Sequence, residues 1–463
     1  MNPQPSIDIA KLQKDPKFVL DALSRSAPGL YPMGDRPALF VTDPESVVSV
    51  LTSSAFEKTA ATLRYRYALG DGAATSGFTT EDRSAYAPLS SLHALRRRKR
   101  TWLTPAFRAR PADVAGSIVR SVQTAIADLA PCAEVELHNF TSELILRAEI
   151  ADLFNRQIPE SVLAAYRLYR DTLCEVDQQI RAATSCDAIF IRGSSTAAQG
   201  QMTASQSKRR ALFHQAVREL IDAQVVDSDR TDDPITLLQQ ARFVENDQPM
   251  SEVQLYNSII GLIFASFENT ATSITWALWL LATHPDCCAR VRAECMDGTI
   301  SLDGYLASCI DETLRLQSPV WSLGRECVTE TSLGGQTISA GTVLFVSPWV
   351  QHRHQQLWED STMFHPERFQ TQSIRNDGRY LPFGLGPQMC LGRMRSLTEI
   401  AAVVATLLLD RNVEPVIGKD PPDAVFRTIQ RPEPGVYVRL TKRSDVSLNQ
   451  PADYARFSPL TLS

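Results

Sequence analysis

The chain has 463 residues, of which 44% are hydrophobic and 21% are charged, a composition typical of globular proteins. Its formal net charge of −5 gives no reason to expect nucleic acid as a partner. Length alone suggests about three domains, at roughly 150 residues per domain.

The N-terminus and the cysteines indicate a compartment. The first six residues, MNPQPS, contain no charged segment followed by an apolar one, so we expect neither a signal peptide nor a membrane anchor. The chain has nine cysteines and no C-x-x-C spacing, which argues against a zinc or iron–sulfur site. An odd number of cysteines without such a framework suits a reducing compartment. We therefore expect a soluble, cytoplasmic protein.

The first regular elements precede a polar loop and a basic run. Residues 38–42 predict a short strand, and Asp43 is placed to cap a helix that begins at Pro44. Residues 68–92 are rich in Gly, Ser and Thr and predict a loop. The basic run 96–100, RRRKR, fits a solvated helix face better than a nucleic-acid patch, because it stands alone in an acidic protein.

Two helices are predicted at 160–183 and 206–227, joined by a polar linker from Arg192 to Ser207. Such a pair could form a lid over a buried site, or the linker could be a plain surface connection.

The longest apolar run extends from Val253 to Thr283 and contains one charge, Glu268. A transmembrane helix is disfavoured because Glu268 and Asn269 would lie at its centre, where polar groups are costly in lipid. We expect a central helix buried in protein, roughly 46 Å long. Helical patterns dominate elsewhere, with strand-like runs near 38–42, 326–347 and 425–441.

The most informative segment is the run FGLGPQMCLGR, from Phe383 to Arg393. A thiolate at Cys390 could bind a haem iron, supported by backbone N–H groups of a tight turn and by the N-terminus of a following helix. Gly384 and Gly386 would permit the turn, and Gly392 a close backbone approach. A thiolate ligand favours O–O cleavage, which indicates oxygen activation. The alternative is a Gly-Pro turn beside a buried free cysteine.

The pattern Phe-x-x-Gly-x-x-x-Cys-x-Gly, beginning at Phe383, resembles the cysteine-ligand loop of the cytochrome P-450 family. The resemblance extends over about residues 30 to 442 and implies a mainly α fold, a helical prism with a small β-rich region. Membrane-bound members of the family carry an N-terminal anchor helix, so the resemblance also implies a soluble enzyme of bacterial type. It implies haem b, with Cys390 as the axial ligand of the iron and Phe383 shielding the sulfur. Because residues from 93 to 395 would grip the haem, we expect one domain over residues 1–463.

The middle of the apolar run, from Ala265 to Thr270, has the sequence ASFENT and resembles the family's oxygen-binding stretch. Glu268 matches its acid, and burial should raise the pKa of the carboxyl group, which suits a proton relay. Ser266 and Asn269 depart from the usual Gly and Thr. The resemblance implies that Glu268, Asn269 and Thr270 handle dioxygen and protons, although Thr270 lies about 100° round the helix from Asn269. The alternative is that Glu268 is a buried acid with a structural partner.

Glu312 and Arg315 are three residues apart, a spacing typical of a helical ion pair. With the later segment FHPERF, from Phe364 to Phe369, they resemble the family's buried ion-pair network that supports the cysteine loop. The resemblance implies this structural role for Glu312, Arg315 and Arg368.

Haem propionates need cationic partners. The resemblance implies Arg325 as one, and an arginine of the basic run as another. Its register is open: the pair is either Arg96 with Arg100 or His93 with Arg97. A cation usually stands two residues before the cysteine, where this chain has the neutral Gln388.

The function implied is that of a monooxygenase, which uses two electrons to activate dioxygen and oxidises a small, mostly hydrophobic organic substrate, for example in natural-product biosynthesis. The basic run would attract an acidic ferredoxin or flavodoxin, itself reduced by an NAD(P)H-dependent reductase. Asn269 leaves open other chemistry: oxidative cyclisation, coupling, desaturation, nitration or peroxide-driven oxidation. A non-catalytic haem-binding recruitment module is a third hypothesis. A candidate substrate pocket consists of Ile263, Phe264, Val320, Trp321 and Leu323.

Overall fold

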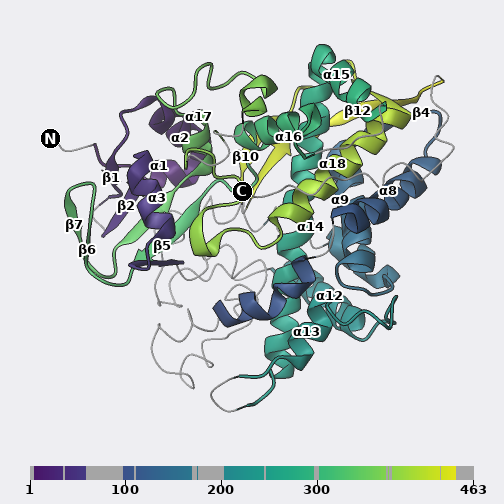
Figure 1. Cartoon of the computed structure of the whole chain (residues 1–463), viewed down its shortest axis with the longest axis horizontal. Coiled ribbons are helices and arrows are strands. Elements are labelled where there is room, and N and C mark those ends of the chain that lie inside the picture. Colours follow the sequence, from purple (N-terminus) through teal and green to yellow (C-terminus); the bar gives the residue numbers. More distant parts are fainter. Residues whose placement is uncertain are drawn as a thin grey trace.

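A computed structural model describes residues 5–34, 37–58, 97–108, 111–168, 175, 203–243, 247–296, 302–371, 374, 378–427 and 429–444. Helices make up most of the described chain, and the β-strands gather mainly on one side (Figure 1). The predicted mainly α fold is thereby confirmed. The helices are α1 (Ile9–Lys14), α2 (Pro16–Arg25), α3 (Pro44–Thr52), α8 (Pro111–Ala127), α9 (Leu137–Asp152), α12 (Ala204–Ile221), α13 (Pro234–Gln240), α14 (Glu252–Thr283), α15 (Pro285–Met296), α16 (Tyr305–Leu316), α17 (Pro348–Arg353) and α18 (Arg393–Asp410).

The 32-residue helix α14 corresponds to the long apolar run and passes through the middle of the molecule (Figure 1). A capping box fixes its start: the Ser251 hydroxyl accepts the N–H of Gln254, and the Gln254 side chain accepts the N–H of Ser251. Helices α9 and α18 pack along it, and α8 packs against both of them. No helix within the described ranges combines the length and apolar character that crossing a membrane requires.

The largest sheet has the strand order β1-β2-β8-β5-β3. Its β2 and β8 run parallel, with Val41 opposite Val346, and the other neighbouring pairs are antiparallel. Smaller sheets contain β10-β11, β4-β12-β9 and β6-β7. The strands are β1 (Leu30–Pro32), β2 (Ala38–Val41), β3 (Phe56–Lys58), β4 (Cys132–Glu136), β5 (Leu323–Cys327), β6 (Thr331–Leu333), β7 (Gln336–Ile338), β8 (Val343–Val346), β9 (Arg411–Pro415), β10 (Asp423–Phe426), β11 (Gln430–Glu433) and β12 (Tyr437–Lys442).

The predicted cap at Asp43 is confirmed, whereas the boundaries predicted for a later helix and its linker are wrong. Asp43 caps α3, and its carboxylate accepts the N–H of Ser46 at 2.9 Å. The helix predicted at 206–227 is α12, which begins at Ala204 and ends at Ile221. The linker therefore ends earlier than predicted, because Thr203 and Gln206 form a capping box. The helix predicted at 160–183 is described only over 160–168 and at residue 175, and the rest of the linker and loop 68–92 lie outside the described residues.

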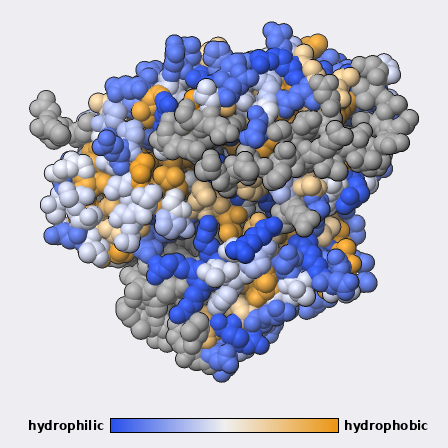
Figure 2. Space-filling model, in the orientation of Figure 1, coloured by the Kyte–Doolittle hydropathy of each residue, from blue (hydrophilic) through white to orange (hydrophobic). Residues whose placement is uncertain are grey.

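The face of the molecule in Figure 2 is mainly hydrophilic, with hydrophobic residues in small separate patches. The apolar side chains are instead collected in buried clusters, the largest of which joins α8, α9, α14, α16 and α18. The rigid centre of the molecule is thus helical, and the β-rich side is packed beside it.

Candidate active site

Cys390 lies in a tight loop that leads into α18. Its backbone N–H donates to the carbonyl of Phe383 at 2.9 Å, and the N–H of Gly384 donates to the carbonyl of Leu381 at 3.0 Å. Gly392 is the N-cap of α18. The positive end of an 18-residue helix therefore begins three residues after the cysteine, where it favours a negatively charged sulfur.

The loop packs closely on its surroundings. Gly386 has a φ of +71°, and a Cβ atom there would lie 2.7 Å from the backbone oxygen of Leu51 in α3. A Cβ atom at Gly392 would touch the ring of Phe107, at 3.4 Å. Gly386 is therefore required both by its backbone conformation and by the approach of α3.

Burial and nearby positive charges have opposite effects on the pKa of the Cys390 thiol. The residue is exposed, yet enough protein surrounds its sulfur for desolvation to raise the pKa of the thiol. The N–H of Gly392 and the positive charges of Arg100, Lys58 and Arg393 act in the opposite direction. Binding to a metal ion would deprotonate such a thiol outright.

Arg97, one candidate propionate partner, and Gln388, which stands where a cation is usual, meet at the carboxylate of Glu57, on β3. Nη1 of Arg97 lies 2.6 Å from Oε1 of Glu57, and the side chain of Arg97 is 63% exposed. The amide nitrogen of Gln388 donates to Oε2 of the same carboxylate at 3.1 Å. Sequence reasoning missed Glu57, which carries no motif of its own and lies far along the chain from Gln388.

Arg325, on β5, is a buried cation with spare hydrogen-bonding capacity. The residue is 4% exposed, and its Nη1 donates to the carbonyl of Gly324 at 3.0 Å. Its Nε has no hydrogen-bond partner within the described part of the chain. Burial lowers the pKa of Arg325 to about 10, against the opposing effect of Glu57. Of the two registers in the basic run, His93 and Arg96 lie outside the described residues, whereas Arg100 acts electrostatically on Cys390.

Ala265 and Asn269 lie one turn apart on α14, on a face that is less buried than its neighbours. Ala265 is exposed, whereas Phe264 and Glu268 are buried. The amide nitrogen of Asn269 donates to the carbonyl of Ala265 at 3.3 Å. Its Oδ1 is buried and has no hydrogen-bond partner among the residues that the structure covers. Asn269 therefore keeps an acceptor available on this face.

The carboxylate of Glu268 lies in a buried polar cluster built from three other parts of the chain. Nη2 of Arg431, on β11, lies 2.7 Å from Oε1. The hydroxyl of Tyr166 donates to Oε2 at 2.7 Å, and Nε2 of His138, on α9, lies 3.8 Å from Oε1. Glu268 thus has the structural partners that the alternative interpretation required. Its buried carboxylate is in contact with a cation and with a hydroxyl group. No pattern in the sequence indicated these partners, which lie more than 100 residues away.

Thr270 faces away from Asn269 and towards α18. Its hydroxyl donates to the carbonyl of Ser266 at 3.1 Å and lies 2.9 Å from the hydroxyl of Ser396. The part of Thr270 in handling dioxygen stays a prediction; in the structure the 100° turn from Asn269 directs its hydroxyl to a contact with α18.

The five predicted pocket residues are divided among different parts of the core. Ile263 and Phe264 are buried in the largest cluster, Trp321 packs against the second, and Leu323 packs against the third. The Trp321 ring nitrogen donates to the carbonyl of Arg427 at 2.8 Å. Val320 is half-buried, and its carbonyl accepts the hydroxyl of Ser318. Ile263, Trp321 and Leu323 therefore contact different clusters of the core, and the role of the five residues in a substrate pocket stays a prediction.

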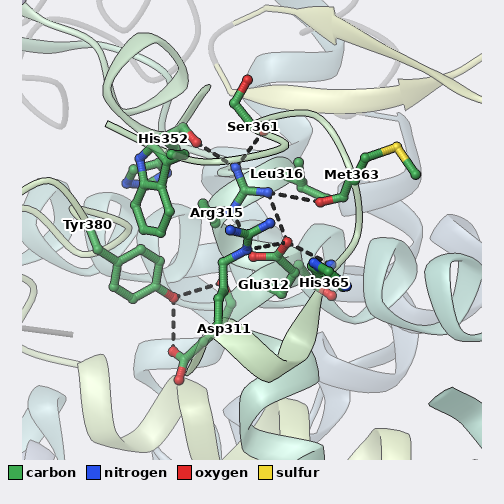
Figure 3. A network of polar contacts seen from close by, with 12 residues as sticks. Asp311, Glu312, Arg315, Leu316, His352, Ser361, Met363, His365 and Tyr380 are labelled. Atoms are coloured by element: carbon green, nitrogen blue, oxygen red, sulfur yellow. Dashed lines mark hydrogen bonds and ion pairs between the residues drawn. The ribbon is translucent and has the colours of Figure 1, made fainter. Parts of the chain in front are cut away.

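Glu312 and Arg315 lie together in a buried polar network (Figure 3), and Arg368 joins them through Glu312. Arg315, on α16, is 0% exposed and contacts both carboxylate oxygens of Glu312, at 2.7 and 2.8 Å. Nε of Arg368 lies 3.1 Å from Glu312. The remaining donors of Arg315 bind backbone carbonyls, those of His352, Ser361 and Met363.

His352, on α17, connects this network to the cysteine loop and was not identified from the sequence. Its carbonyl accepts from Arg315 at 2.6 Å, and its ring Nε2 accepts the backbone N–H of Leu381 at 2.7 Å. The carbonyl of Leu381 in turn accepts the N–H of Gly384. The ion pair is therefore linked to the start of the loop by an unbroken series of contacts.

These residues fit a thiolate-bound haem. The sulfur of Cys390 has a backbone N–H and a helix N-terminus beside it, as a thiolate ligand needs. An anionic propionate would satisfy the orphaned Nε of Arg325, whose burial without such a partner is unfavourable.

Comparison with known proteins places the chain among related sequences. The family described as "Cytochrome P450" matches residues 30–440. Cyclooctat-9-en-7-ol 5-monooxygenase from Streptomyces melanosporofaciens is 26% identical over 70% of this chain and 71% of its own length. Cytochrome P450 4X1 from Mus musculus is 32% identical over 43% of this chain, and the chain spans only 41% of that relative.

Solved structures share the fold. A crystal structure of a cytochrome P450, CYP102L1, superposes with a TM-score of 0.71 at 21% identity, covering 94% of this chain and 99% of that one. The crystal structure of CYP175A1 from a Thermus species gives a TM-score of 0.70 at 22% identity, covering 95% of this chain and 100% of that one.

Proposed function

Because the chain belongs to the cytochrome P450 family, we propose that it is a haem-thiolate monooxygenase with haem b bound through Cys390. The haem would supply dioxygen activation with two electrons, by which one oxygen atom enters an organic substrate and the other leaves as water. The observation that carries this proposal is the loop of Cys390, where the N–H of Gly392 supports the sulfur.

The residues around the loop have separate tasks in this proposal. Arg325 holds a propionate with its buried guanidinium, and Phe383 shields the sulfur from water. Gly384 and Gly392 allow the backbone to follow the ring closely. Asn269 offers its amide to oxygen or to a water molecule. Glu268 delivers protons from its buried cluster, and its contacts to Tyr166 and Arg431 fix its position.

The substrate is proposed to be small and mostly hydrophobic. The Streptomyces relative is named as a monooxygenase of cyclooctat-9-en-7-ol, which supports the reaction class and a role in natural-product biosynthesis. Ile263, Phe264, Val320, Trp321 and Leu323 remain a prediction for the pocket, and Ile263 and Phe264 would contribute only from beneath its surface.

Electrons are proposed to come from an NAD(P)H-dependent reductase through a ferredoxin or flavodoxin. Positive charges surround the sulfur of Cys390, since Arg100, Lys58 and Arg393 all lie within electrostatic range. They would attract an acidic carrier, and the attraction would weaken as salt is added. We further propose a soluble, cytoplasmic enzyme without nucleic-acid or membrane partners.

A second candidate is a haem-thiolate enzyme with non-hydroxylating chemistry, such as oxidative cyclisation, coupling, desaturation, nitration or peroxide-driven oxidation. Asn269 favours it, because an amide does not transfer a proton as a hydroxyl does and leaves Oδ1 unpaired within the part of the chain that the structure describes. The non-catalytic recruitment module is the third candidate, motivated by the departures at Asn269 and Gln388.

The spectrum of the reduced protein with carbon monoxide tests haem-thiolate binding. We expect the strongly red-shifted Soret band of thiolate-bound haem in the wild type, and its loss in Cys390→Ser. Cys132→Ser is the matched control, since Cys132 is also exposed, and should keep the band. A wild type without the shift would contradict the proposal.

Turnover then separates the three candidates. Ferric protein is titrated with a panel of hydrophobic compounds, and products are identified for those that change the spin state. Oxygen insertion driven by NAD(P)H supports the monooxygenase. Other products, or turnover with peroxide alone, support the second candidate, and no turnover with any binder supports the third.

A further inference from the structure

The carboxylate of Glu57 joins three elements around Cys390. It accepts a hydrogen bond of 3.1 Å from the side-chain amide of Gln388, in the cysteine loop. It also forms an ion pair of 2.6 Å with Arg97, which belongs to the helical residues 97–103. It is itself part of β3, which pairs with the strand of Arg325. The side chain of Glu57 is only 17% exposed, so its contact to Gln388 is partly shielded from water, whereas Arg97 remains 63% exposed.

The contact to Gln388 has one chemically allowed orientation. A carboxylate only accepts hydrogen bonds, so the amide nitrogen must face Glu57 and the amide oxygen must point elsewhere. That oxygen is buried and has no hydrogen-bond partner within the described ranges. The amide is therefore held by Glu57 at the cost of leaving its acceptor unsatisfied, which marks this contact as the one that orients Gln388.

Gln388 is a sensitive position because it ends the turn Gly386–Gln388, two residues before Cys390. Gly386 cannot shift towards α3 without meeting Leu51. A turn confined on that side and held by Glu57 at its other end has little freedom to move the cysteine.

Glu57 also provides negative charge beside the cations Arg97 and Arg325. It neutralises Arg97 and favours the charged form of Arg325, against the effect of burial. On the same strand, Lys58 lies opposite Arg325 in the sheet register. Removal of Glu57 would leave Arg97, Arg325 and Lys58 with less compensating negative charge.

We propose that Glu57 is a positioning residue of the haem site: it fixes the turn before Cys390 through Gln388, and its negative charge makes the iron harder to reduce. The inference deepens the proposed function and rests on it. Glu57 touches no reacting atom and acts through Gln388 and through its charge.

The variant Glu57→Gln tests both parts, because it keeps the size of the side chain and removes its charge. We expect the reduction potential of the haem to become more positive, since a lost negative charge favours the ferrous form. We expect haem to transfer to apomyoglobin about ten-fold faster, as for the replacement of one charged hydrogen bond by a neutral one. Arg97→Gln removes a positive charge and should shift the potential in the opposite direction.

Two further variants separate positioning from a general charge effect. Glu330→Gln changes the same charge at an exposed residue beyond β5 and should leave potential and haem transfer unchanged. Gln388→Leu removes the contact to Glu57 and should speed haem transfer. Combining it with Glu57→Gln should add little, because Glu57→Gln weakens that same contact from a charged to a neutral hydrogen bond. Additive effects would overturn the route through Gln388.

The proposal fails if Glu57→Gln retains the wild-type potential and haem transfer while its carbon monoxide spectrum shows that it is folded and thiolate-bound. Failure of the proposed function looks different, since the wild type itself would then lack the red-shifted band.

Discussion

The ring of His352 accepts a hydrogen bond at Nε2 from the backbone N–H of Leu381, 2.7 Å away. A neutral imidazole is needed for this, because a protonated ring has no acceptor. Arg315 donates to the carbonyl of the same histidine. A single residue therefore connects the charged network to the cysteine loop, and its protonation would break the connection.

Stability should fall in acid because of His352. Burial, followed by the charge of Arg315, lowers the pKa of His352 from 6.5 to about 3. Between pH 6.5 and about pH 3 the unfolded chain is protonated at His352, whereas the folded protein is not. This contribution to stability is therefore complete above pH 6.5 and is lost as the pH falls towards 3. The full slope is about 1.4 kcal/mol per pH unit.

His352→Gln, which keeps an acceptor and does not titrate, should lose less stability than the wild type between pH 7 and pH 4.5. The measurement is urea unfolding at each pH. His365→Gln is the control, since His365 is exposed, and it should follow the wild type. Equal slopes for His352→Gln and the wild type would exclude His352 as the source.

Glu312→Ala should be strongly destabilising. It leaves the guanidinium of Arg315 at 0% exposure without its counter-ion, and uncompensated buried charges cost about 3–5 kcal/mol. The urea midpoint of the haem-bound protein should fall accordingly. Glu359→Ala removes an exposed acid nearby and should change stability by less than about 0.5 kcal/mol. Similar midpoints for both variants would show that the network is energetically neutral.

Glu268→Gln distinguishes a proton relay from a structural acid. Gln keeps the size and can still accept from Tyr166, but it carries no proton to transfer. A relay predicts that NAD(P)H-driven product formation falls by about 10²-fold or more, while peroxide-driven turnover is largely kept. Tyr166→Phe, which removes one neighbour of the carboxylate, serves as the comparison. A parallel fall in both kinds of turnover, together with stability, would identify a structural acid.

Thr270→Val should affect stability more than turnover. Its hydroxyl bonds Ser396 on α18, and losing a buried hydrogen bond costs about 1–2 kcal/mol. Asn269→Ala removes the side chain on the more open face of α14 and should instead change the amount of product formed per NAD(P)H consumed. The amount of product formed per NAD(P)H consumed is measured for both variants under the same conditions. A larger loss in Thr270→Val than in Asn269→Ala would place the oxygen-handling group at Thr270.

Glu399 should oppose His352 in its dependence on pH. Burial, followed by the neighbouring Glu149, raises the pKa of Glu399 well above 4.5, against the attraction of Arg395 at 2.8 Å. The folded protein holds this proton more tightly than the unfolded chain, so stability is lost as the pH rises above 4.5. Glu399→Gln should therefore gain on the wild type from pH 5 to pH 8 in urea unfolding. A constant difference would show that Glu399 does not titrate in this range.

Local features were predictable from the sequence. The cap at Asp43 and the helix through Glu268 follow from rules that act over a few residues, and both are present. The pairing of Glu312 with Arg315 follows from helical spacing. That the chain forms a single domain stays a prediction. It is supported by the pairing of β2 with β8, which joins segments about 300 residues apart.

Contacts between distant segments were not predictable. Arg431 and Glu268, or Gln388 and Glu57, meet only because the folded chain places their elements together. No local pattern at Glu57 or His352 records such a partner. For the same reason the five pocket residues, chosen as apolar neighbours in sequence, are separated among different clusters of the core.

The parallel pairing of β2 with β8 also constrains the order of events during synthesis. Val41 lies opposite Val346, about 300 residues later in the chain. A ribosome adds about 5–20 residues per second, so β2 must wait on the order of tens of seconds for its neighbour. The sheet that carries Glu57 and Arg325 can be completed only after that delay, when most of the helices have already been made. Capture of the cofactor should therefore be a late step in the life of each newly made chain.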